Sequence, residues 1–308
     1  MGKVAVVFPG QGSQKVGMGK ELAAAYEVAR RTFEEADDVL GFSVSRLCFE
    51  GPEEELVRTE NTQPALLTTC VAVFRALREE GFEPQAAAGH SLGEYAALVA
   101  AGAVDFAAAV ETVRLRGQLM EAAVPGGAGT MAAVLGLDDE TVEALCTEEE
   151  GIVVPATYNA PGQVVVAGET GAVLRVMEKA KQRGARRVQR LNVSGPFHSP
   201  LLAAAGVSLA EKLEKIAVRP PAIPVYSNVT AQPVASAGEI KDNLAKQVSA
   251  PVRWVETIRN MAADGIDSFV EAGPGKVLSG LIKRILDGAE CTCVESPETL
   301  NAWKERGV

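Results

Sequence analysis

The sequence predicts an α/β protein that combines a large domain, built on a mostly parallel sheet, with a small inserted domain. Over most of the 308 residues, helical patterns alternate with single short apolar strands. This alternation is typical of a parallel sheet that carries helices on both faces. Between residues 126 and 196 the order changes to β-α-β-β-α-β, which predicts a separate small unit with its own sheet.

Length and composition restrict the classes of function. A chain of 308 residues can bury a substantial core and favours two domains. The formal net charge of −10 argues against non-specific binding to nucleic acid. No apolar run approaches the roughly 20 residues of a membrane span, so we expect no membrane partner. The five cysteines contain no Cys-x-x-Cys pair, which indicates neither a disulfide framework nor a zinc site and favours a cytoplasmic location.

The large domain is expected in two parts, residues 1–125 and 197–308. In the first part the pattern predicts strands at 4–8 and 86–88 and helices at 20–40, 63–80, 93 onward and 105–124. In the second part it predicts strands at 223–227, 268–271 and 291–295 and helices at 200–216, 239–248, 252–263, 276 onward and at the end of the chain.

The inserted domain is expected at residues 126–196, after a glycine-rich linker that begins at Pro125. Its strands are predicted at 131–135, 152–158, 163–167 and 187–193, and its helices at 138–149 and 169–183. The resulting β-α-β-β-α-β order is that of a ferredoxin-like unit.

One stretch carries a nucleophile signal. In Gly89-His90-Ser91-Leu92-Gly93, a strand of small residues leads through a Gly-x-Ser-x-Gly turn into an apolar helix. The two glycines allow the close backbone approach that holds Ser91 in a strained elbow, which makes the large domain α/β-hydrolase-like. The amide of Leu92 then lies at the first turn of the helix, where it can stabilise an oxyanion. A glycine-bracketed serine in an ordinary turn is the alternative.

The chain has only two histidines, so the candidates for a general base are few. His90 precedes the nucleophile and is expected to project to the opposite side. His198 lies in a Gly-Pro-containing loop at the domain boundary, where it can act as base toward Ser91 and then as acid toward the leaving group. No motif indicates an Asp or Glu that orients the imidazole, and a backbone or amide carbonyl can do so instead.

Two arginines in the helix at 105–124 have different surroundings. Arg114 has Glu111 and Gln118 within one turn, which predicts a solvated face. Arg116 has no carboxylate at these spacings, so it is free to bind an anionic acyl group. A buried ion pair between Arg116 and a distant carboxylate is the alternative.

Several stretches along the whole chain together resemble the malonyl-CoA:acyl carrier protein transacylases, an acyltransferase family of fatty acid and polyketide synthesis. The matching stretches are Phe8-Pro9-Gly10-Gln11-Gly12-Ser13-Gln14, Thr62-Gln63-Pro64-Ala65, Gly89-His90-Ser91-Leu92-Gly93-Glu94-Tyr95, Arg116-Gly117, Gly195-Pro196-Phe197-His198-Ser199 and Glu271-Ala272-Gly273-Pro274-Gly275-Lys276.

The resemblance implies a role for individual residues and a reaction. Ser91 and His198 match the catalytic pair, and the amides of Gln11 and Leu92 match the oxyanion hole. Arg116 matches the clamp on the malonyl carboxylate, and Gln247 falls where the family orients its histidine through a main-chain carbonyl. Phe197 and Asn159 are implied to contact the substrate. The partners implied are malonyl-CoA and acyl carrier protein, in a ping-pong transfer by a monomer that needs no cofactor.

Two other functions stay open at this point. The first is a patatin-like serine hydrolase, because Asp287-Gly288 matches the short Asp-Gly pattern of such enzymes. A turn that ends a helix is the simpler interpretation of this pair. The second is a non-catalytic docking subunit for carrier proteins.

An acidic carrier protein would require a local basic patch. The candidates are Lys181, Arg183, Arg186, Arg187, Arg190, Lys276, Lys283 and Arg284.

Overall fold

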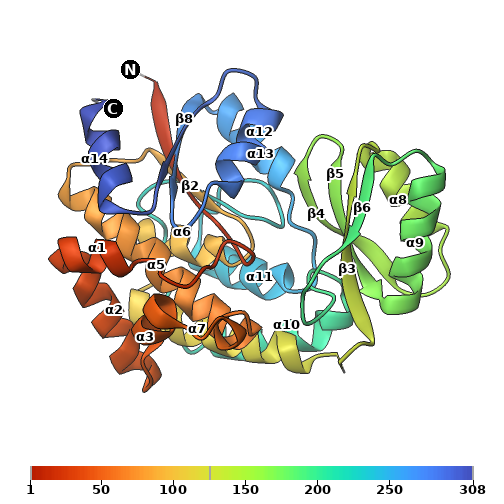
Figure 1. Ribbon diagram of the computed structural model, residues 1–308, viewed down its shortest axis with the longest axis horizontal. Coiled ribbons are helices and arrows are strands. Elements are labelled where there is room, and N and C mark those ends of the chain that lie inside the picture. The colour runs from red at the N-terminus through yellow and green to blue at the C-terminus, as the bar shows by residue number, and fades with distance from the viewer. Residues whose placement is uncertain (1, 125, 307–308) are drawn as a thin grey trace.

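The computed structural model describes residues 2–124 and 126–306 (Figure 1). The large domain is built on a five-stranded sheet in the order β7-β2-β1-β8-β9, and every neighbouring pair is parallel. This confirms the predicted parallel sheet. Its strands are β1 (Lys3–Phe8), β2 (Ala86–Gly89), β7 (Val225–Tyr226), β8 (Ile266–Ala272) and β9 (Glu290–Val294).

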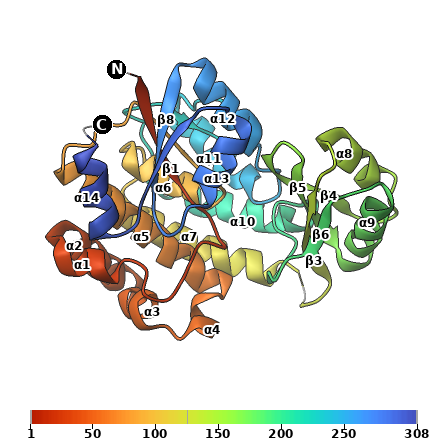
Figure 2. The ribbon, with the colours of Figure 1, turned by 45° about the horizontal axis from the view of Figure 1, so that its top comes forward.

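Helices cover both faces of this sheet (Figures 1 and 2). Alternate residues of β1 enter two different cores, as the two-residue period of a strand requires. Val6 and Phe8 pack in the core that includes the helices from the first third of the chain, whereas Ala5 and Val7 pack with α12 and α13. The helices are α1 (Lys20–Ala25), α2 (Glu27–Leu40), α3 (Val44–Glu50), α4 (Glu53–Leu56), α5 (Thr59–Glu79), α6 (Gly93–Ala100), α7 (Phe106–Ala122), η1 (Pro200–Leu202), α10 (Ala203–Leu213), α11 (Ala237–Gln247), α12 (Trp254–Ala263), α13 (Val277–Ile285) and α14 (Pro297–Glu305).

Some helix boundaries differ from those that the sequence predicts. The helix expected at 20–40 is divided, because Tyr26 has an extended backbone between α1 and α2. α5 begins at Thr59 rather than at residue 63, which places Pro64 beyond the first turn. Asp105 is the N-cap residue of α7 but makes no side-chain capping hydrogen bond, and its carboxylate instead binds Arg219 at 2.9 Å.

The small domain contains β3 (Gly129–Leu135), α8 (Asp139–Thr147), β4 (Val153–Ala160), β5 (Gln163–Glu169), α9 (Thr170–Gln182) and β6 (Arg187–Arg190). Its four strands form an antiparallel sheet in the order β4-β5-β3-β6, which confirms the ferredoxin-like fold. One face of this sheet packs under α8 and α9, and Met131 and Val165 on the other face join the core of the large domain.

The exact limits of the two domains stay a prediction. β3 starts at Gly129 and β6 ends at Arg190, both inside the expected range of 126–196. The start of the predicted linker, Pro125, lies outside the described residues. Within residues 2–124 and 126–306, no helix combines the length and apolar character needed to cross a membrane.

Candidate active site

Ser91 lies in a sharp turn at the carboxyl end of β2, directly before α6. Its φ of 51° is in the left-handed region, which is strained for a residue with a side chain. Two glycines permit this turn. A Cβ on Gly89 would lie 1.9 Å from the carbonyl carbon of Gly93, and a Cβ on Gly93 would lie 2.1 Å from the carbonyl oxygen of Phe8. The local geometry is therefore that of a nucleophile elbow.

The elbow is held by Asn228, which follows the adjacent strand β7. Oδ1 of Asn228 accepts a 2.6 Å hydrogen bond from the main-chain N–H of Ser91, and its Nδ2 donates to the carbonyl of Gly89 at 2.7 Å. These two bonds give hydrogen-bond partners to one main-chain group on each side of His90, at the point where the chain leaves the sheet. Asn228 thus offsets part of the strain at the serine.

Ser91 and His198 form a hydrogen-bonded pair. Nε2 of His198 lies 2.8 Å from Oγ of Ser91, and Nδ1 donates to the carbonyl oxygens of Gln247 at 2.8 Å and Ala250 at 3.1 Å. Because Nδ1 faces only acceptors, it carries the proton, and Nε2 is left to accept the serine proton. Among the described residues, no carboxylate contacts this imidazole.

His198 is neutral at physiological pH. Burial lowers its pKa to about 3, and the positive charge of Arg116 acts in the same direction, against the hydrogen bonds to the two carbonyls. An imidazole that is uncharged at pH 7 is in the form required of a general base. Its backbone is also strained, with a φ of 58°.

Arg116 reaches Ser91 from α7. Its Nη2 lies 3.1 Å from Oγ of Ser91 and 2.8 Å from Oε1 of Gln247, and its Nη1 donates to Oε1 of Gln63 at 2.9 Å. The guanidinium is 1% exposed, and it has no ion pair within 4.0 Å in the described parts of the chain. The alternative of a direct buried ion pair is therefore wrong, because amide oxygens take the place of a carboxylate.

A cavity of about 160 Å³ opens above Ser91 between the two domains. Large-domain residues Gln11, Leu92 and Phe197 line it together with Met131 and Asn159 of the small domain. No described residue accepts a hydrogen bond from the main-chain amides of Gln11 and Leu92. Two such N–H donors beside a nucleophile are suited to bind an oxyanion.

Comparison with known proteins identifies the family. The family model described as the acyl transferase domain matches residues 5–298. The chain is 48% identical to the malonyl CoA-acyl carrier protein transacylase of Bacillus subtilis over 97% of its own length and 96% of that protein, and 45% identical to its Escherichia coli counterpart over 99% and 100%. The chain belongs to the malonyl CoA-acyl carrier protein transacylase family.

Solved structures of this transacylase family share the fold. The Coxiella burnetii transacylase superposes with a TM-score of 0.97 at 43% identity, over 99% of this chain and 98% of that one. A malonyl-transacylase solved in complex with a type II polyketide synthase acyl-carrier protein gives 0.96 at 45% identity, over 99% of both chains. The chain is therefore an acyltransferase.

The remaining residues that the transacylase resemblance implies lie around the same cavity. Oδ1 of Asn159 lies 2.8 Å from Nε2 of His90. The rings of His90 and Trp254 also pack together, with their centroids 5.6 Å apart. Among the described residues, the imidazole that is hydrogen-bonded to Oγ of Ser91 is that of His198, and the His90 ring makes no such bond. Phe197 is buried and lines the cavity next to His198. The substrate contacts of Asn159 and Phe197 stay predictions.

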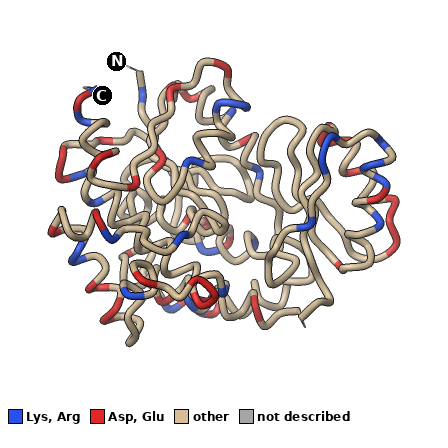
Figure 3. The backbone as a smooth tube through the Cα atoms, in the orientation of Figure 1, with Lys and Arg blue, Asp and Glu red and all other residues tan. Residues whose placement is uncertain are grey.

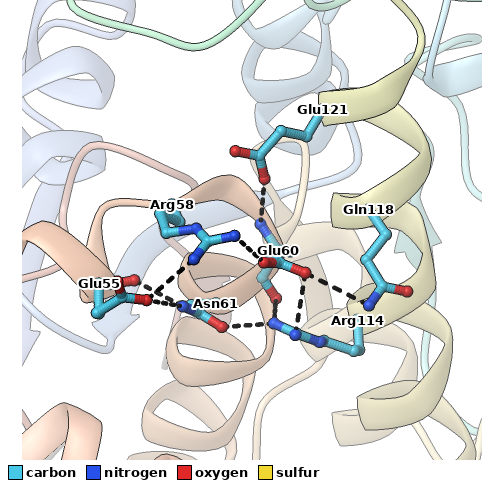
Figure 4. Close-up of polar contacts among 7 residues, drawn as sticks. All are labelled: Glu55, Arg58, Glu60, Asn61, Arg114, Gln118 and Glu121. Carbon is cyan, nitrogen blue, oxygen red and sulfur yellow. Dashed lines mark hydrogen bonds and ion pairs between the residues drawn. The ribbon is translucent and has the colours of Figure 1, made fainter.

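Arg114 does not lie on the solvated face that its sequence neighbours indicate. It forms an ion pair with Glu60 at 3.0 Å and donates to the side chain of Asn61, both at the start of α5 (Figure 4). Glu111, the expected partner, instead binds Lys212 at 2.7 Å. The cluster in Figure 4 thus ties α7 to α5 two residues before Arg116.

The structure brings in three residues that sequence reasoning did not assign to the site: Gln63, Glu94 and Asn228. Gln63 and Glu94 belong to stretches that carry the transacylase resemblance, but their polarity alone does not indicate burial. Asn228 follows a strand of only two residues, at the carboxyl edge of the sheet. A polar residue at this edge, beside the elbow strand, is the signal that could have indicated its role.

Proposed function

We propose that the chain transfers a malonyl group from malonyl-CoA to the phosphopantetheine thiol of acyl carrier protein, through a malonyl ester on Ser91. The observation that carries this proposal is the position of Arg116. Its guanidinium lies 3.1 Å from the nucleophilic oxygen and has no carboxylate partner among the described residues. A planar guanidinium can bind the carboxylate of an acyl group by two parallel hydrogen bonds.

The first half-reaction loads the enzyme. Oγ of Ser91 attacks the thioester carbonyl while Nε2 of His198 takes the hydroxyl proton. The amides of Gln11 and Leu92 stabilise the negative charge on the tetrahedral intermediate. When the C–S bond breaks, His198 returns the proton to the leaving thiolate of coenzyme A, and a malonyl ester remains on Ser91.

The second half-reaction runs the same steps in reverse order. The thiol of the carrier protein gives its proton to His198 and attacks the ester carbonyl, and the serine alkoxide leaves and recovers the proton. One neutral imidazole serves both half-reactions, which supports a ping-pong mechanism. Because nucleophile, base and anion-binding group all come from the chain, we propose that no cofactor takes part and that a cytoplasmic monomer is sufficient.

The hydrolase alternative is poorly supported by the fold. Asp287 follows α13 and precedes β9, whereas Ser91 follows the carboxyl end of β2. Strands β2 and β9 belong to one parallel sheet. The amino end of β9 and the carboxyl end of β2 therefore lie at opposite ends of the strands. This topology argues against a Ser91–Asp287 dyad, and the 2.8 Å contact between Nε2 of His198 and Oγ of Ser91 supports His198 as the base.

Docking of an acidic carrier protein requires basic residues near the cavity. β6 carries two arginines, and Figure 3 shows Lys and Arg along this strand. Some candidates are already engaged, because Lys181 pairs with Glu178, Arg190 binds Thr130 and Arg284 binds the carbonyl of Pro161. We propose that Lys276 and Lys283, at the two ends of α13, contribute to docking together with Arg183 and Arg186.

Isotope exchange tests the proposal. Labelled coenzyme A is incubated with malonyl-CoA and the chain, without carrier protein. A ping-pong transferase moves label into malonyl-CoA, because the first half-reaction is reversible alone. A hydrolase releases free malonate, and a docking subunit changes neither compound, so either of these results would reject the proposal.

A further inference from the structure

Glu94, the second residue of α6, is a buried carboxylate with no part in the steps above. Its side chain is 2% exposed. Oε2 accepts hydrogen bonds from Nε2 of Gln247 at 2.6 Å and from the main-chain N–H of Asn228 at 3.1 Å. An ionised carboxylate removed from water needs a compensating charge as well as hydrogen bonds.

Arg116 requires the opposite charge. Its guanidinium is almost fully buried, its Nε has no hydrogen-bond partner, and the amide oxygens of Gln63 and Gln247 are neutral acceptors. The Gln247 side chain lies between the two ions, with Oε1 toward Arg116 and Nε2 toward Glu94. A guanidinium only donates and a carboxylate only accepts, so this amide has one possible orientation.

The titration behaviour of both groups agrees with their coupling. Burial lowers the pKa of Arg116, and the charge of Glu94 acts in the opposite direction. Burial raises the pKa of Glu94 to about 7, against the hydrogen bonds from Asn228 and Gln247 and the charge of Arg116. Above pH 7 each ion therefore stabilises the other.

We propose that Glu94 is the counter-ion of Arg116, joined to it through the side-chain amide of Gln247, and that it is a positioning residue that limits how strongly Arg116 binds an anionic acyl group. A carboxylate in direct contact would occupy the donors that an anionic acyl group needs. A carboxylate one amide away compensates the buried charge and leaves those donors available. This inference rests on the proposed malonyl transfer.

The test compares the thermal stability of Glu94→Gln in three states at pH 8: the free enzyme, the acetyl-enzyme and the malonyl-enzyme. Glutamine keeps the shape and offers one oxygen to both hydrogen bonds that Oε2 accepts, so the substitution mainly removes the charge. We expect the free variant to melt about 3 to 8 °C below the wild type. A malonyl group brings its own carboxylate to Arg116, so the malonyl-enzyme should recover at least half of this deficit. The acetyl-enzyme should recover none.

The equilibrium between malonyl-CoA and malonyl-enzyme provides a second readout that a merely structural role would not change. Linkage requires that any stability recovered on malonylation also favours malonylation. The ratio of malonyl-enzyme to free enzyme should therefore rise about 3-fold to 30-fold in Glu94→Gln at fixed malonyl-CoA and coenzyme A. The corresponding acetyl ratio should not change.

Glu271→Gln is the matched control. Glu271 is also a buried carboxylate of the large domain, where it accepts the N–H groups of Leu278 and Ser279. It has no hydrogen-bonded connection to Arg116 among the described residues. Its replacement should lower the melting temperature by the same amount in all three states.

A double variant covers the case in which Glu94→Gln alone does not fold. Arg116→Met with Glu94→Gln removes both ions, so it should fold and melt above the single Glu94→Gln variant. Failure of the double variant to fold, while Arg116→Met alone folds, would overturn the inference. Equal deficits of Glu94→Gln in all three states would overturn it as well, provided that the wild type is malonylated. A wild type that takes up no malonyl group rejects the proposed function and this inference with it.

Discussion

Nδ1 of His198 donates a 2.8 Å hydrogen bond to the main-chain carbonyl of Gln247, in the position where many serine enzymes have a carboxylate. A carbonyl fixes the tautomer but adds no negative charge. The protonated imidazole is therefore stabilised less than it would be by a carboxylate. This suits a base that must give its proton back to a thiolate. The same residue uses its side chain to bind Arg116, so one position of α11 orients both His198 and Arg116.

The first prediction separates these two functions of Gln247. Gln247→Met keeps the main-chain carbonyl and removes the side-chain acceptor. We expect acetyl-CoA transfer to stay within about tenfold of the wild type, because His198 keeps its orientation. Malonyl-CoA transfer should fall about 10-fold to 100-fold, the value of a hydrogen bond to a charged group. Steady-state kcat/KM for both substrates checks this, and an equal loss of about 10,000-fold for both would show that the side chain orients the histidine.

The second prediction concerns the pair formed by Ser91 and His198. Ser91→Ala removes the nucleophile and should abolish the acyl-enzyme. Adding His198→Ala should lower the residual transfer little further, since two groups that act as a unit do not lose activity additively. Single-turnover rates of the two single variants and the double variant measure this. A double variant that loses the product of the two single effects would mean that His198 acts independently of the serine.

The third prediction concerns pH. His198 must be neutral to accept the serine proton, and its pKa is about 3 because of burial and the charge of Arg116. The rate of acetyl-enzyme formation should therefore stay level as the pH falls below 6.5, and decline only as it approaches the lowered pKa. Arg116→Met removes one of the causes that lower this pKa, so the decline should begin at higher pH. Rapid-quench measurements on both proteins test this, and identical acid limbs would contradict the role of the charge.

The same pKa predicts how stability depends on pH. The folded-state pKa of His198 lies below the ordinary value of 6.5, so between these values the unfolded chain binds more protons than the folded one. The contribution of His198 to stability is therefore complete above pH 6.5 and is lost as the pH falls toward 3. His198→Gln should flatten this part of the curve of unfolding free energy against pH. An unchanged slope would show that the histidine is accessible to protons in the folded state.

The fifth prediction concerns acyl selectivity. Arg116→Ala removes a charge-assisted interaction in a partly dry cavity, which costs about 2 to 4 kcal/mol, or roughly 30-fold to 1000-fold in kcat/KM for malonyl-CoA. Acetyl-CoA has no carboxylate to lose, so its transfer should change little. Arg116→Lys should restore only part of the preference, because an ammonium cannot bind a carboxylate through a planar pair of donors. Parallel losses for both substrates would reject the clamp.

The sequence predicts those features of the fold and of the site that are determined by short segments of the chain. The elbow at Ser91 follows from two glycines, and the choice of His198 follows from there being only two histidines. The β-α-β-β-α-β order predicts the small domain because strand and helix periods are properties of short segments. Short segments do not predict every helix boundary, since nothing near Tyr26 indicates the break between α1 and α2.

Long-range contacts are what the sequence does not predict. Arg114 has a suitable partner one turn away, yet it binds Glu60 because α5 packs against α7. The alternatives for Arg116 could not be separated from the sequence either. The residues that decide them, Gln63 and Gln247, are 53 and 131 positions away. From the sequence, Glu94 is an ordinary charged residue at the start of a helix. Its burial follows only from the fold, which places Gln247 and Asn228 against it.

The most direct test of the account is to trap the acyl-enzyme. Labelled malonyl-CoA is mixed with the chain without carrier protein, the reaction is quenched with acid, and the labelled peptide is mapped. The account predicts close to one malonyl group per chain, on Ser91, which moves to the carrier thiol when carrier protein is added before the quench. Label on another residue, or no retained label from a chain that still transfers malonyl groups, would contradict it.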